Sequence, residues 1–542
     1  MIRWRIVALA LTATLASLPA CTPGESRVES GNRLGIFHIG NGSDPESLDP
    51  HVATGIPAGN VFSAIYEGLV VSNPYTLEPE PGVAERWEIS ADGLRYRFYL
   101  RQNARWSNGD PVTAEDFRWT YERYLTPAMG NEWAYMLFPV RGAKEFFSGD
   151  LTDFTQVGIR TLGEYSLEIE LKNPTPYFLQ LLAHSSSAVV HRPTIEAHGS
   201  PTARYSAWTR PQNIVTNGPF VPYEWKISRP LKVRKNPHYW DRERLRLNEI
   251  HFHPTENATT EERLFRAGQL HKTNTLPTDK VPVYRAANSP ALRVQPYLGT
   301  YYYQVNTTRP GLSDARVRRA LAMSIDRAAI SRSILRGTSI PAFSMTPPGT
   351  LGYQPPAVFS FDPDKARQLL AEAGYPNGTG FPSFEILYNT SEGHRKVAVA
   401  IQQMWKRELN IDVTLTNQEW KVYLDSRDNM DYDIARAGWI GDYVDPLTFL
   451  DLGLSSNGNN NTGFADPHYD WLISEHIPAA RTRPERLARF ATAEAYLLEK
   501  MPFIPIYTYQ SKYLLDPTIR GLPPNIRDHY NYRYITLGSA AD

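Results

Sequence analysis

Apolar and polar residues alternate along several stretches of the chain, as a half-buried β-strand requires. The clearest stretch is 94–100, LRYRFYL, and the same period of two recurs in 167–171 and 411–415. A period of two places the apolar side chains on one face of a sheet and the polar ones on the other. We therefore predict a strand in each of these three segments.

Other stretches repeat apolar residues at helical spacing and have recognisable ends. Ser313 or Asp314 can cap a helix that Gly337 would close. A second helix is predicted over 392–408, directly before the strand at 411–415. Because helical and strand segments alternate throughout and no internal repeat is found, the sequence predicts an α/β fold.

Composition narrows the classes of partner. The chain has 57 Lys and Arg against 57 Asp and Glu, which does not favour nucleic acid as a partner. Its mass of 61.4 kDa exceeds what one hydrophobic core normally supports, so we expect two or three lobes. The 12 Trp and 31 Tyr would suit a cleft lined for a ligand, although the core is the default place for each of them.

The N-terminus has the layout of an export signal. Basic residues precede an apolar run over 6–18, and the sequence LPAC at 18–21 resembles a bacterial lipobox that ends at Cys21, the only cysteine. We interpret 1–20 as a signal peptide and 21–33 as a lipidated N-terminus and linker. The alternative is an ordinary signal peptide beside a stray thiol. Lipidation of Cys21 would anchor the mature chain to a membrane.

No motif for catalysis is present. The sequence contains no Walker loop, no Gly-x-Gly-x-x-Gly after a strand, no Gly-x-Ser-x-Gly and no His-Glu-x-x-His. His251 and His253 would share one strand face, but no third ligand stands at motif spacing, so we expect two solvent-facing histidines rather than a zinc site. We predict neither an enzyme nor a metal or cofactor.

Ordered motifs along the chain resemble the extracytoplasmic oligopeptide-binding proteins of ABC importers, solute-binding protein family 5. The resemblance covers nearly the whole mature length, and the motifs are SLDPH at 47–51, PGVAERWE at 81–88, WSNGDPVTAEDF at 106–117, NIVTNGPF at 213–220, TYYYQVN at 300–306 and the long block at 387–450. It implies a bilobal periplasmic-binding-protein-like fold (type II), with three domains and a ligand cleft between the lobes.

The same motifs imply where the domains begin and end. Domain I would be discontinuous and consist of residues 34–66, 192–293 and 510–542. Domain II would be the insertion over 67–191, and domain III would span 294–509.

The segment ARAGWIGDY supplies a candidate peptide site. Its strand-like residues run to Ile440, and Gly438 would let another backbone approach closely, so a peptide could pair there as an extra strand. The resemblance implies that Asp442 receives the α-ammonium group of the ligand. Without the resemblance, an Asp beside a Gly is usually a turn residue.

The resemblance also implies the partners of the rest of the ligand. Arg436, Arg427 and His394 match positions that face the C-terminal carboxylate, which Arg can bind through two hydrogen bonds. Surface salt bridges are the alternative, above all for Arg427. Trp439 and Trp420 match positions that line side-chain pockets, although either could be a core tryptophan.

The function implied is that of a periplasmic, membrane-anchored lipoprotein, a monomer, that binds short peptides in extended form and delivers them to the permease subunits of an ABC importer. Two alternatives remain open: a narrow binder of cell-wall (murein) peptides and a peptide-sensing lipoprotein.

Overall fold

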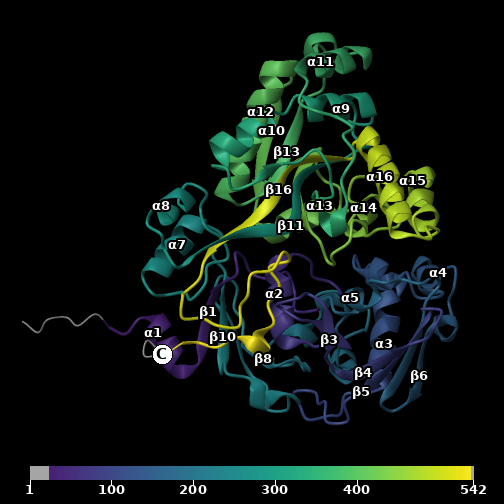
Figure 1. Ribbon diagram of the computed structural model, residues 1–542, viewed down its shortest axis with the longest axis vertical. Coiled ribbons are helices and arrows are strands. Elements are labelled where there is room, and N and C mark those ends of the chain that lie inside the picture. Colours follow the sequence, from purple (N-terminus) through teal and green to yellow (C-terminus); the bar gives the residue numbers. More distant parts are fainter. Residues whose placement is uncertain (1–23, 539–542) are drawn as a thin grey trace, which may run out of the picture.

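A computed structural model describes residues 24–538, which fold into two lobes (Figure 1). The two long strands β11 (Leu292–Val305) and β16 (Phe503–Leu514) pair antiparallel at the boundary. We call the chain from β11 to β16 lobe 2, and the described residues before and after it lobe 1. Among the described residues, no helix is long and apolar enough to cross a bilayer. The predicted signal peptide and Cys21 lie outside the described residues.

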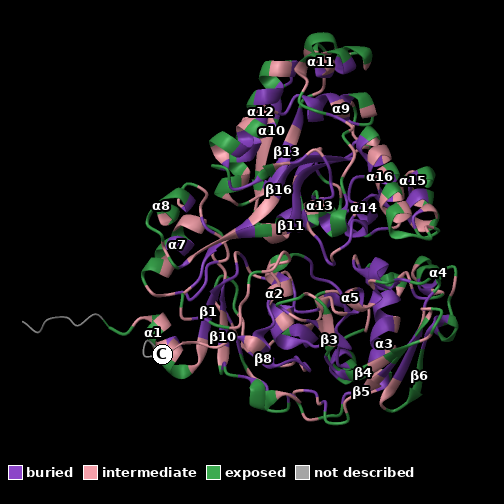
Figure 2. Ribbon diagram, in the orientation of Figure 1, coloured by how far each residue is buried: buried purple, intermediate pink, exposed green. Residues whose placement is uncertain are grey.

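Lobe 2 is built on one mixed sheet of strand order β12-β16-β11-β15-β13-β14. Besides β11 and β16, its strands are β12 (Ile340–Pro341), β13 (Phe384–Asn389), β14 (Val413–Gln418) and β15 (Ile434–Ile440). Its helices are α9 (Ala315–Met323), α10 (Arg327–Ala329), α11 (Pro363–Glu372), α12 (Glu392–Leu409), α13 (Trp420–Asp428), α14 (Leu447–Leu450), α15 (Pro467–Trp471) and α16 (Arg483–Lys500). The strands are mostly buried, while α11 and α12 turn exposed faces outward (Figure 2).

Lobe 1 contains two four-stranded sheets and a short hairpin. The first sheet has the strand order β1 (Ile36–Gly40), β10 (Glu249–His253), β9 (Leu231–Lys235), β8 (Phe220–Glu224). The second sheet has the order β4 (Ala84–Ile89), β5 (Arg95–Leu100), β7 (Ser166–Glu170), β6 (Ile159–Gly163). In the hairpin, β2 (Val70–Ser72) pairs with β3 (Pro79–Pro81). Its main helices are α1 (Arg27–Leu34), α2 (Ile56–Ile65), α3 (Ala114–Leu125), α4 (Ala143–Ser148), α5 (Phe178–Leu182), α6 (Arg192–Ala197), α7 (Ala258–Arg266) and α8 (Val281–Ala286). The domain boundaries given above stay a prediction.

The three strands and the helix over 392–408 that the sequence predicts are confirmed. Residues 94–100 contain β5, in which Tyr96, Phe98 and Leu100 are buried and Arg95 and Arg97 are exposed. The predicted strand at 167–171 is β7, and the one at 411–415 begins two residues later as β14. The helix at 392–408 is α12, whose buried residues recur every three or four positions and pack against β13 and β14.

One helix ends earlier than predicted. Asp314 caps α9, but the helix stops at Met323 instead of continuing to Gly337. The side chain of Asp326 accepts a hydrogen bond from the Ala329 backbone N–H at 2.8 Å and starts the separate helix α10. A short polar side chain that caps a new helix competes with continuation of the old one.

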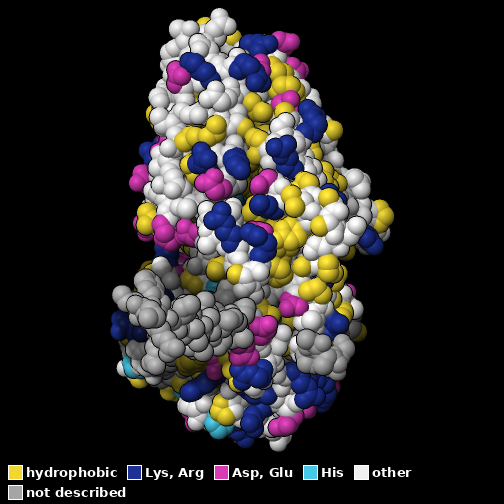
Figure 3. Space-filling view, turned by 90° about the vertical axis from the view of Figure 1, so that its left-hand side faces the viewer, with side chains coloured by type: hydrophobic (Ala, Val, Ile, Leu, Met, Phe, Trp, Pro, Cys, Tyr) yellow, Lys and Arg dark blue, Asp and Glu magenta, His cyan; other side chains and the backbone are white. Residues whose placement is uncertain are grey.

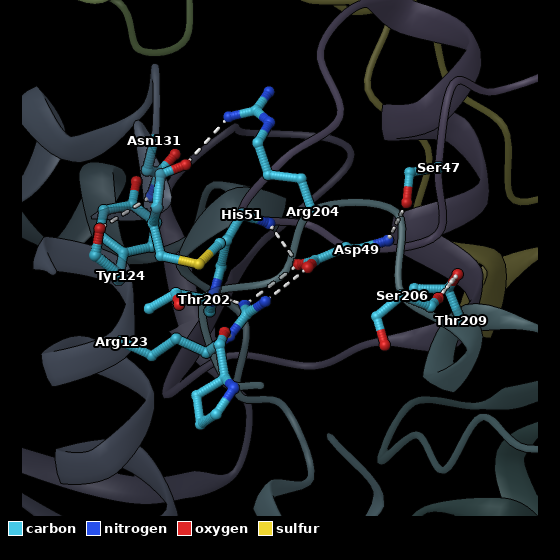
Figure 4. Close-up of polar contacts among 12 residues, drawn as sticks. Ser47, Asp49, His51, Arg123, Tyr124, Asn131, Thr202, Arg204, Ser206 and Thr209 are labelled. Carbon is cyan, nitrogen blue, oxygen red and sulfur yellow. Dashed lines mark hydrogen bonds and ion pairs between the residues drawn. The ribbon is translucent and has the colours of Figure 1, made fainter. Parts of the chain in front are cut away.

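The SLDPH motif forms a buried ion-pair network in lobe 1 (Figure 4). Arg123 of α3 donates to both carboxylate oxygens of Asp49, at 2.6 and 3.2 Å, and both side chains are only 1% exposed. Arg123 also donates to His51 Nδ1 and to the carbonyl of Pro201. Asp49 in turn accepts a hydrogen bond from the His51 backbone N–H. The motif therefore fastens the loop before α2 to α3.

The expectation of two solvent-facing histidines is wrong. His253 is buried and His251 half-buried, because both pack against His38 of the neighbouring strand β1. His38 Nδ1 lies 3.1 Å from His253 Nε2, and the His38 backbone N–H donates to His271 Nδ1. Burial lowers the pKa of His38 to about 2, that of His253 to about 3 and that of His271 to about 4.

From the lowered pKa values of these histidines we predict that acid destabilises the folded protein. Each is neutral in the fold but binds a proton near pH 6.5 when unfolded, so stability is complete above pH 6.5 and falls as the pH drops towards the folded pKa values. Each contributes a loss of about 1.4 kcal/mol per pH unit. The free energy of unfolding is measured in urea at pH 7, 6 and 5. In His253→Gln its decrease per pH unit should be smaller than in the wild type by the contribution of one histidine. The control His198→Gln removes an exposed histidine and should leave it unchanged. Equal pH dependence in all three proteins would contradict the prediction.

Candidate functional site

Strand β15 has one paired and one open edge. One edge pairs with β11 along its whole length, from Val305 opposite Ile434 to Gly299 opposite Ile440. The other edge pairs with β13 only at Ile434 and Ala435. No strand of the described chain pairs with this second edge from Arg436 to Ile440, which we call the open edge. Unpaired backbone groups at such an edge can accept a peptide as a further strand.

The side chains of the open edge alternate between core and accessible space. Ala437 and Trp439 are buried, whereas Arg436 and Ile440 are half-buried and Gly438 is exposed. A Cβ atom at Gly438 would lie 2.4 Å from the Tyr509 hydroxyl oxygen and 3.3 Å from Arg436. A side chain at this position would therefore clash within the protein as well as occupy the accessible side of the strand.

Asp442 lies two residues beyond β15 and is buried between the lobes. Its Oδ2 accepts a hydrogen bond from the Tyr135 hydroxyl of lobe 1 at 2.8 Å, and its Oδ1 lies 3.5 Å from His184 Nε2. Burial raises the pKa of Asp442 to about 6, although the Tyr135 hydrogen bond and the charge of Arg527 oppose the shift. Burial also lowers the pKa of His184 to about 3, so this histidine does not neutralise the carboxylate at pH 7.

Arg436 is a half-buried cation with only neutral partners. Its guanidinium donates to the Asn389 side-chain oxygen at 3.2 Å and to the Tyr509 hydroxyl at 2.9 Å, and it lies 4.9 Å from the centre of the Tyr301 ring. Its Nε has no hydrogen-bond partner within the described chain. A buried charge is costly without an opposite charge, so an anion placed here would be stabilised.

Arg427, in contrast, is already neutralised. It lies 3.4 Å from Glu132 of lobe 1 and 3.1 Å from Asp428. Burial and the charge of Asp428 raise the pKa of Glu132, while the charge of Arg427 opposes this shift. Arg427 therefore joins the two lobes in this structure, and its predicted contact with a ligand stays a prediction.

His394 stands in the first turn of α12, beside Arg436. Its ring lies 5.6 Å from that of Tyr301, which Arg436 also contacts. Burial, and then the positive charges of Arg436 and Lys512, lower the pKa of His394 well below its ordinary value. A neutral His394 can donate or accept a hydrogen bond without adding to the positive charge.

The two predicted pocket tryptophans differ in their surroundings. Trp439 is buried, with its Nε1 3.4 Å from the Thr448 hydroxyl and its ring 6.2 Å from that of Trp133 in lobe 1. Trp420 is half-buried at the start of α13 and packs so closely on Gly55 of lobe 1 that a Cβ there would lie 2.8 Å away. Both therefore lie where the lobes face each other.

Several contacts between the lobes involve residues that the sequence did not single out. The Tyr177 and Tyr443 rings stack with centres 4.9 Å apart, and the Val444 backbone N–H donates to the Gln180 side chain at 3.2 Å. Aromatic abundance was the only hint of this stacking in the sequence.

The Asn-rich loop 455–461 belongs to the same interface. Asn457, Asn459 and Asn461 are buried, and Asn459 donates to the Glu132 carbonyl of lobe 1 at 3.0 Å. Asn461 likewise donates to the distant Asp428 side chain at 3.2 Å, whereas Asn457 donates to the nearby Asp451 carbonyl.

A groove of about 420 Å³ lies outside this site. Basic residues Arg336, Arg395 and Lys396 line it together with Thr278 and Asp279. Lys and Arg side chains are also numerous on the face of lobe 2 seen in Figure 3. None of the predicted site residues lines the groove. Within residues 24–538, no cluster of three or more His, Cys, Asp or Glu side chains could hold a metal ion.

Comparison with known sequences identifies relatives over most of the chain. The sequence profile described as bacterial extracellular solute-binding proteins, family 5 Middle, matches residues 78–461. The periplasmic oligopeptide-binding protein OppA of Salmonella typhimurium is 36% identical over 490 residues, which are 89% of this chain and 88% of that protein.

Solved structures share the arrangement of the lobes. The complex of Haemophilus influenzae OppA with the peptide RPPGFSPFR has a TM-score of 0.88 at 33% identity, covering 93% of this chain and 99% of that one. The Escherichia coli murein tripeptide-binding protein MppA is 34% identical and has a TM-score of 0.88, covering 93% of this chain and 98% of that one. The unliganded open form of MppA has a TM-score of only 0.61, covering 93% of this chain and 97% of that one. The lobes of this chain are therefore placed as in the peptide complex and not as in the open form.

Proposed function

This chain belongs to the bacterial extracellular solute-binding proteins of family 5, and we propose that it is the peptide-binding component of an oligopeptide ABC importer. It binds short oligopeptides in extended form between its lobes and delivers them to the permease. The family assignment makes it a binding protein and not an enzyme. Peptides bound by relatives, such as RPPGFSPFR in H. influenzae OppA, support this class of ligand.

The observation that carries the proposal is the charge at the two ends of the open edge. Asp442 supplies a carboxylate at one end, and Arg436 supplies a cation without an anionic partner at the other. The six residue steps from Arg436 to Asp442 span about 20 Å of extended backbone, and the two side chains can reach towards each other and so reduce the distance between the charges. A zwitterionic peptide a few residues long matches this separation, and its main chain can pair with the open edge whatever its side chains.

Calorimetry with modified tripeptides tests the proposal. We expect a free tripeptide to bind at least about tenfold more tightly than its N-acetylated form and than its C-terminal amide, because each modification removes one charge and leaves a buried protein charge unpaired. Equal affinity for the free and the N-acetylated peptide would overturn this mode of recognition.

We also propose a periplasmic protein held at the membrane by a lipid on Cys21, after removal of residues 1–20, and a monomer in solution. The LPAC sequence at 18–21 supports the anchor. Mass spectrometry of the mature N-terminus measures the lipid directly, and an unmodified Cys21 would refute it.

A second candidate ligand is a murein peptide. The structural similarity to murein tripeptide-binding MppA supports this alternative. Mass spectrometry of peptides that co-purify with the protein separates the two candidates, because a mixture of unrelated sequences indicates a general oligopeptide carrier and a single cell-wall peptide indicates the narrow one.

A further inference from the structure

One side of the molecule carries six basic side chains without acidic partners. They come from α7, α8 with the loop before it, the π-helical turn Ile330–Ile334 with the residues after it, and α12. Figure 1 shows α7, α8 and α12 on the same side, which faces the viewer in Figure 3. We call the six side chains the basic face: Arg263, Lys280, Arg285, Arg332, Arg336 and Lys396. Lys280 is half-buried and the other five are exposed, and none of them forms an ion pair within residues 24–538.

The elements of the basic face form one continuous surface across the boundary between the lobes. The Tyr284 hydroxyl of α8 donates to the Glu262 side chain of α7 at 2.7 Å. The Thr278 hydroxyl, in the loop before α8, donates to the Ile334 carbonyl at 3.4 Å and so joins lobe 1 to lobe 2. The groove of about 420 Å³ described above is lined by this loop, the π-helical turn and α12.

Few carboxylates oppose these charges. Glu262 and Glu392 are paired with Arg266 and Arg395 on the same two helices, and Asp279 is the carboxylate that lines the groove. The basic face therefore has an excess of positive charge, although the whole chain has a formal net charge of zero. A surface region with such an excess attracts an anionic partner.

Exposed apolar side chains stand among the cations. Val283 is 60% exposed and lies between Lys280 and Arg285 in the sequence. Val399 is 37% exposed, lies one helical turn after Lys396 and lines the groove. Apolar and basic side chains on one face suit the surface of a lipid bilayer, where apolar groups enter the headgroup region and cations meet the phosphates.

The start of the described chain lies against the same side. The Val28 backbone N–H of α1 donates to the Gly268 carbonyl just after α7, at 2.9 Å, and a Cβ atom at Gly268 would lie 3.0 Å from the Ser26 side chain. Cys21 precedes Ser26 by five residues, and a fully extended chain of that length spans at most about 18 Å. A lipid on Cys21 would therefore bring the membrane close to α7.

We propose that the basic face rests on an anionic phospholipid membrane, as a second contact beside the lipid on Cys21. The inference rests on the proposed anchor and goes beyond peptide binding. Each Lys or Arg near such a surface strengthens the attachment by about fivefold, so six cations add substantially to one lipid anchor. None of the predicted peptide-site residues belongs to the basic face, so the peptide site stays outside this contact.

Vesicle sedimentation tests the charge contact without the lipid. The protein is the mature chain, residues 21–542, with Cys21→Ser, and the vesicles are phosphatidylcholine with or without about one third phosphatidylglycerol. We expect binding to the anionic vesicles alone, and loss of most of it at about 0.5 M salt, because salt screens exposed charges. Inorganic phosphate should displace no more protein than chloride of the same ionic strength.

Two double variants locate the contact. Arg285→Gln with Lys396→Gln should weaken binding to the anionic vesicles by about tenfold or more. Lys144→Gln with Lys172→Gln is the matched control, because it removes two exposed cations near α4, on the opposite side of the molecule (Figure 1). The control should change vesicle binding by less than about twofold. Both double variants should bind a tripeptide as the wild type does.

A fluorescent probe reports which side meets the lipid. Cys21 is the only cysteine, so in the Cys21→Ser chain Val283→Cys provides a single thiol for a dye. A quencher on the lipid headgroups should reduce its fluorescence on anionic vesicles. A dye on Leu162→Cys, at a 47% exposed position of β6, should keep its fluorescence.

The outcomes separate this inference from the proposed function. Equal binding to neutral vesicles, no binding to either kind, equal losses in the two double variants or equal quenching of the two dyes would each overturn the membrane contact. Displacement by phosphate would indicate a site for the free ion and overturn it as well. Tripeptide affinity is measured without vesicles, so its loss in the wild type would refute the proposed function alone.

Discussion

Replacing Asp442 by asparagine is expected to weaken the binding of a free tripeptide by about 2 to 5 kcal/mol. The substitution keeps the shape of the side chain and an oxygen that can accept from Tyr135, but it removes the negative charge. The α-ammonium group of the peptide would then be buried without an opposite charge. Calorimetry at pH 7 measures the loss. An N-acetylated tripeptide has no such charge, so its weaker binding should not decline further in the variant.

The same residue gives binding a dependence on pH. Because burial raises the pKa of Asp442 to about 6, the carboxylate is increasingly protonated below pH 6 and affinity should fall by up to about tenfold per pH unit. His184, with a pKa of about 3, and Arg527 keep their charge states between pH 5 and 7. Asp442→Asn should abolish most of this dependence.

The control for both measurements is Asp425→Asn, which changes an exposed carboxylate on α13. It should bind tripeptide as the wild type does at each pH. Wild-type affinity in Asp442→Asn would refute the assignment of this residue to the ligand's ammonium group.

Asp49→Asn is expected to destabilise the protein by about 3 to 5 kcal/mol without contact with any ligand. The substitution leaves the Arg123 guanidinium charged and buried beside a neutral amide, and both original side chains are only 1% exposed. Urea unfolding followed by circular dichroism measures the change. Because Arg123 lowers the pKa of Asp49 against the effect of burial, the pair stabilises the fold at neutral pH and loses this contribution as acid protonates the carboxylate.

An exposed ion pair provides the comparison. Glu196 and Arg192 are 2.7 Å apart on the surface of α6, with side chains 43% and 46% exposed. Glu196→Gln should change stability by no more than about 0.5 kcal/mol. If the two substitutions had equal effects, burial of the Asp49 pair would not be the source of its stabilisation.

Local sequence patterns predicted individual helices and strands, but not which side chains pack against each other from distant parts of the chain. The period of two at β5, the cap of α9 and the helical pattern of α12 depend on residues close in sequence, so each could be predicted from the local sequence. The burial of His253 depends on its packing against His38, which is distant in the chain, and no local signal encodes it.

The candidate site was predicted in part. Asp442 and Arg436 came from the resemblance to a family, since an Asp after a Gly is locally indistinguishable from a turn residue. The pairing of Arg427 with Glu132 joins residues almost three hundred positions apart and was beyond sequence reasoning.

The contacts between the lobes have a further consequence for energy use. The Tyr177–Tyr443 stack and the Arg427–Glu132 ion pair connect the two lobes without a ligand. They therefore favour the closed arrangement by the same amount whether or not a peptide is bound. A permease that sensed closure alone would therefore sometimes accept an empty carrier and hydrolyse ATP for no import. For such a permease, only the additional contacts made by a bound peptide would distinguish the loaded protein from the empty one.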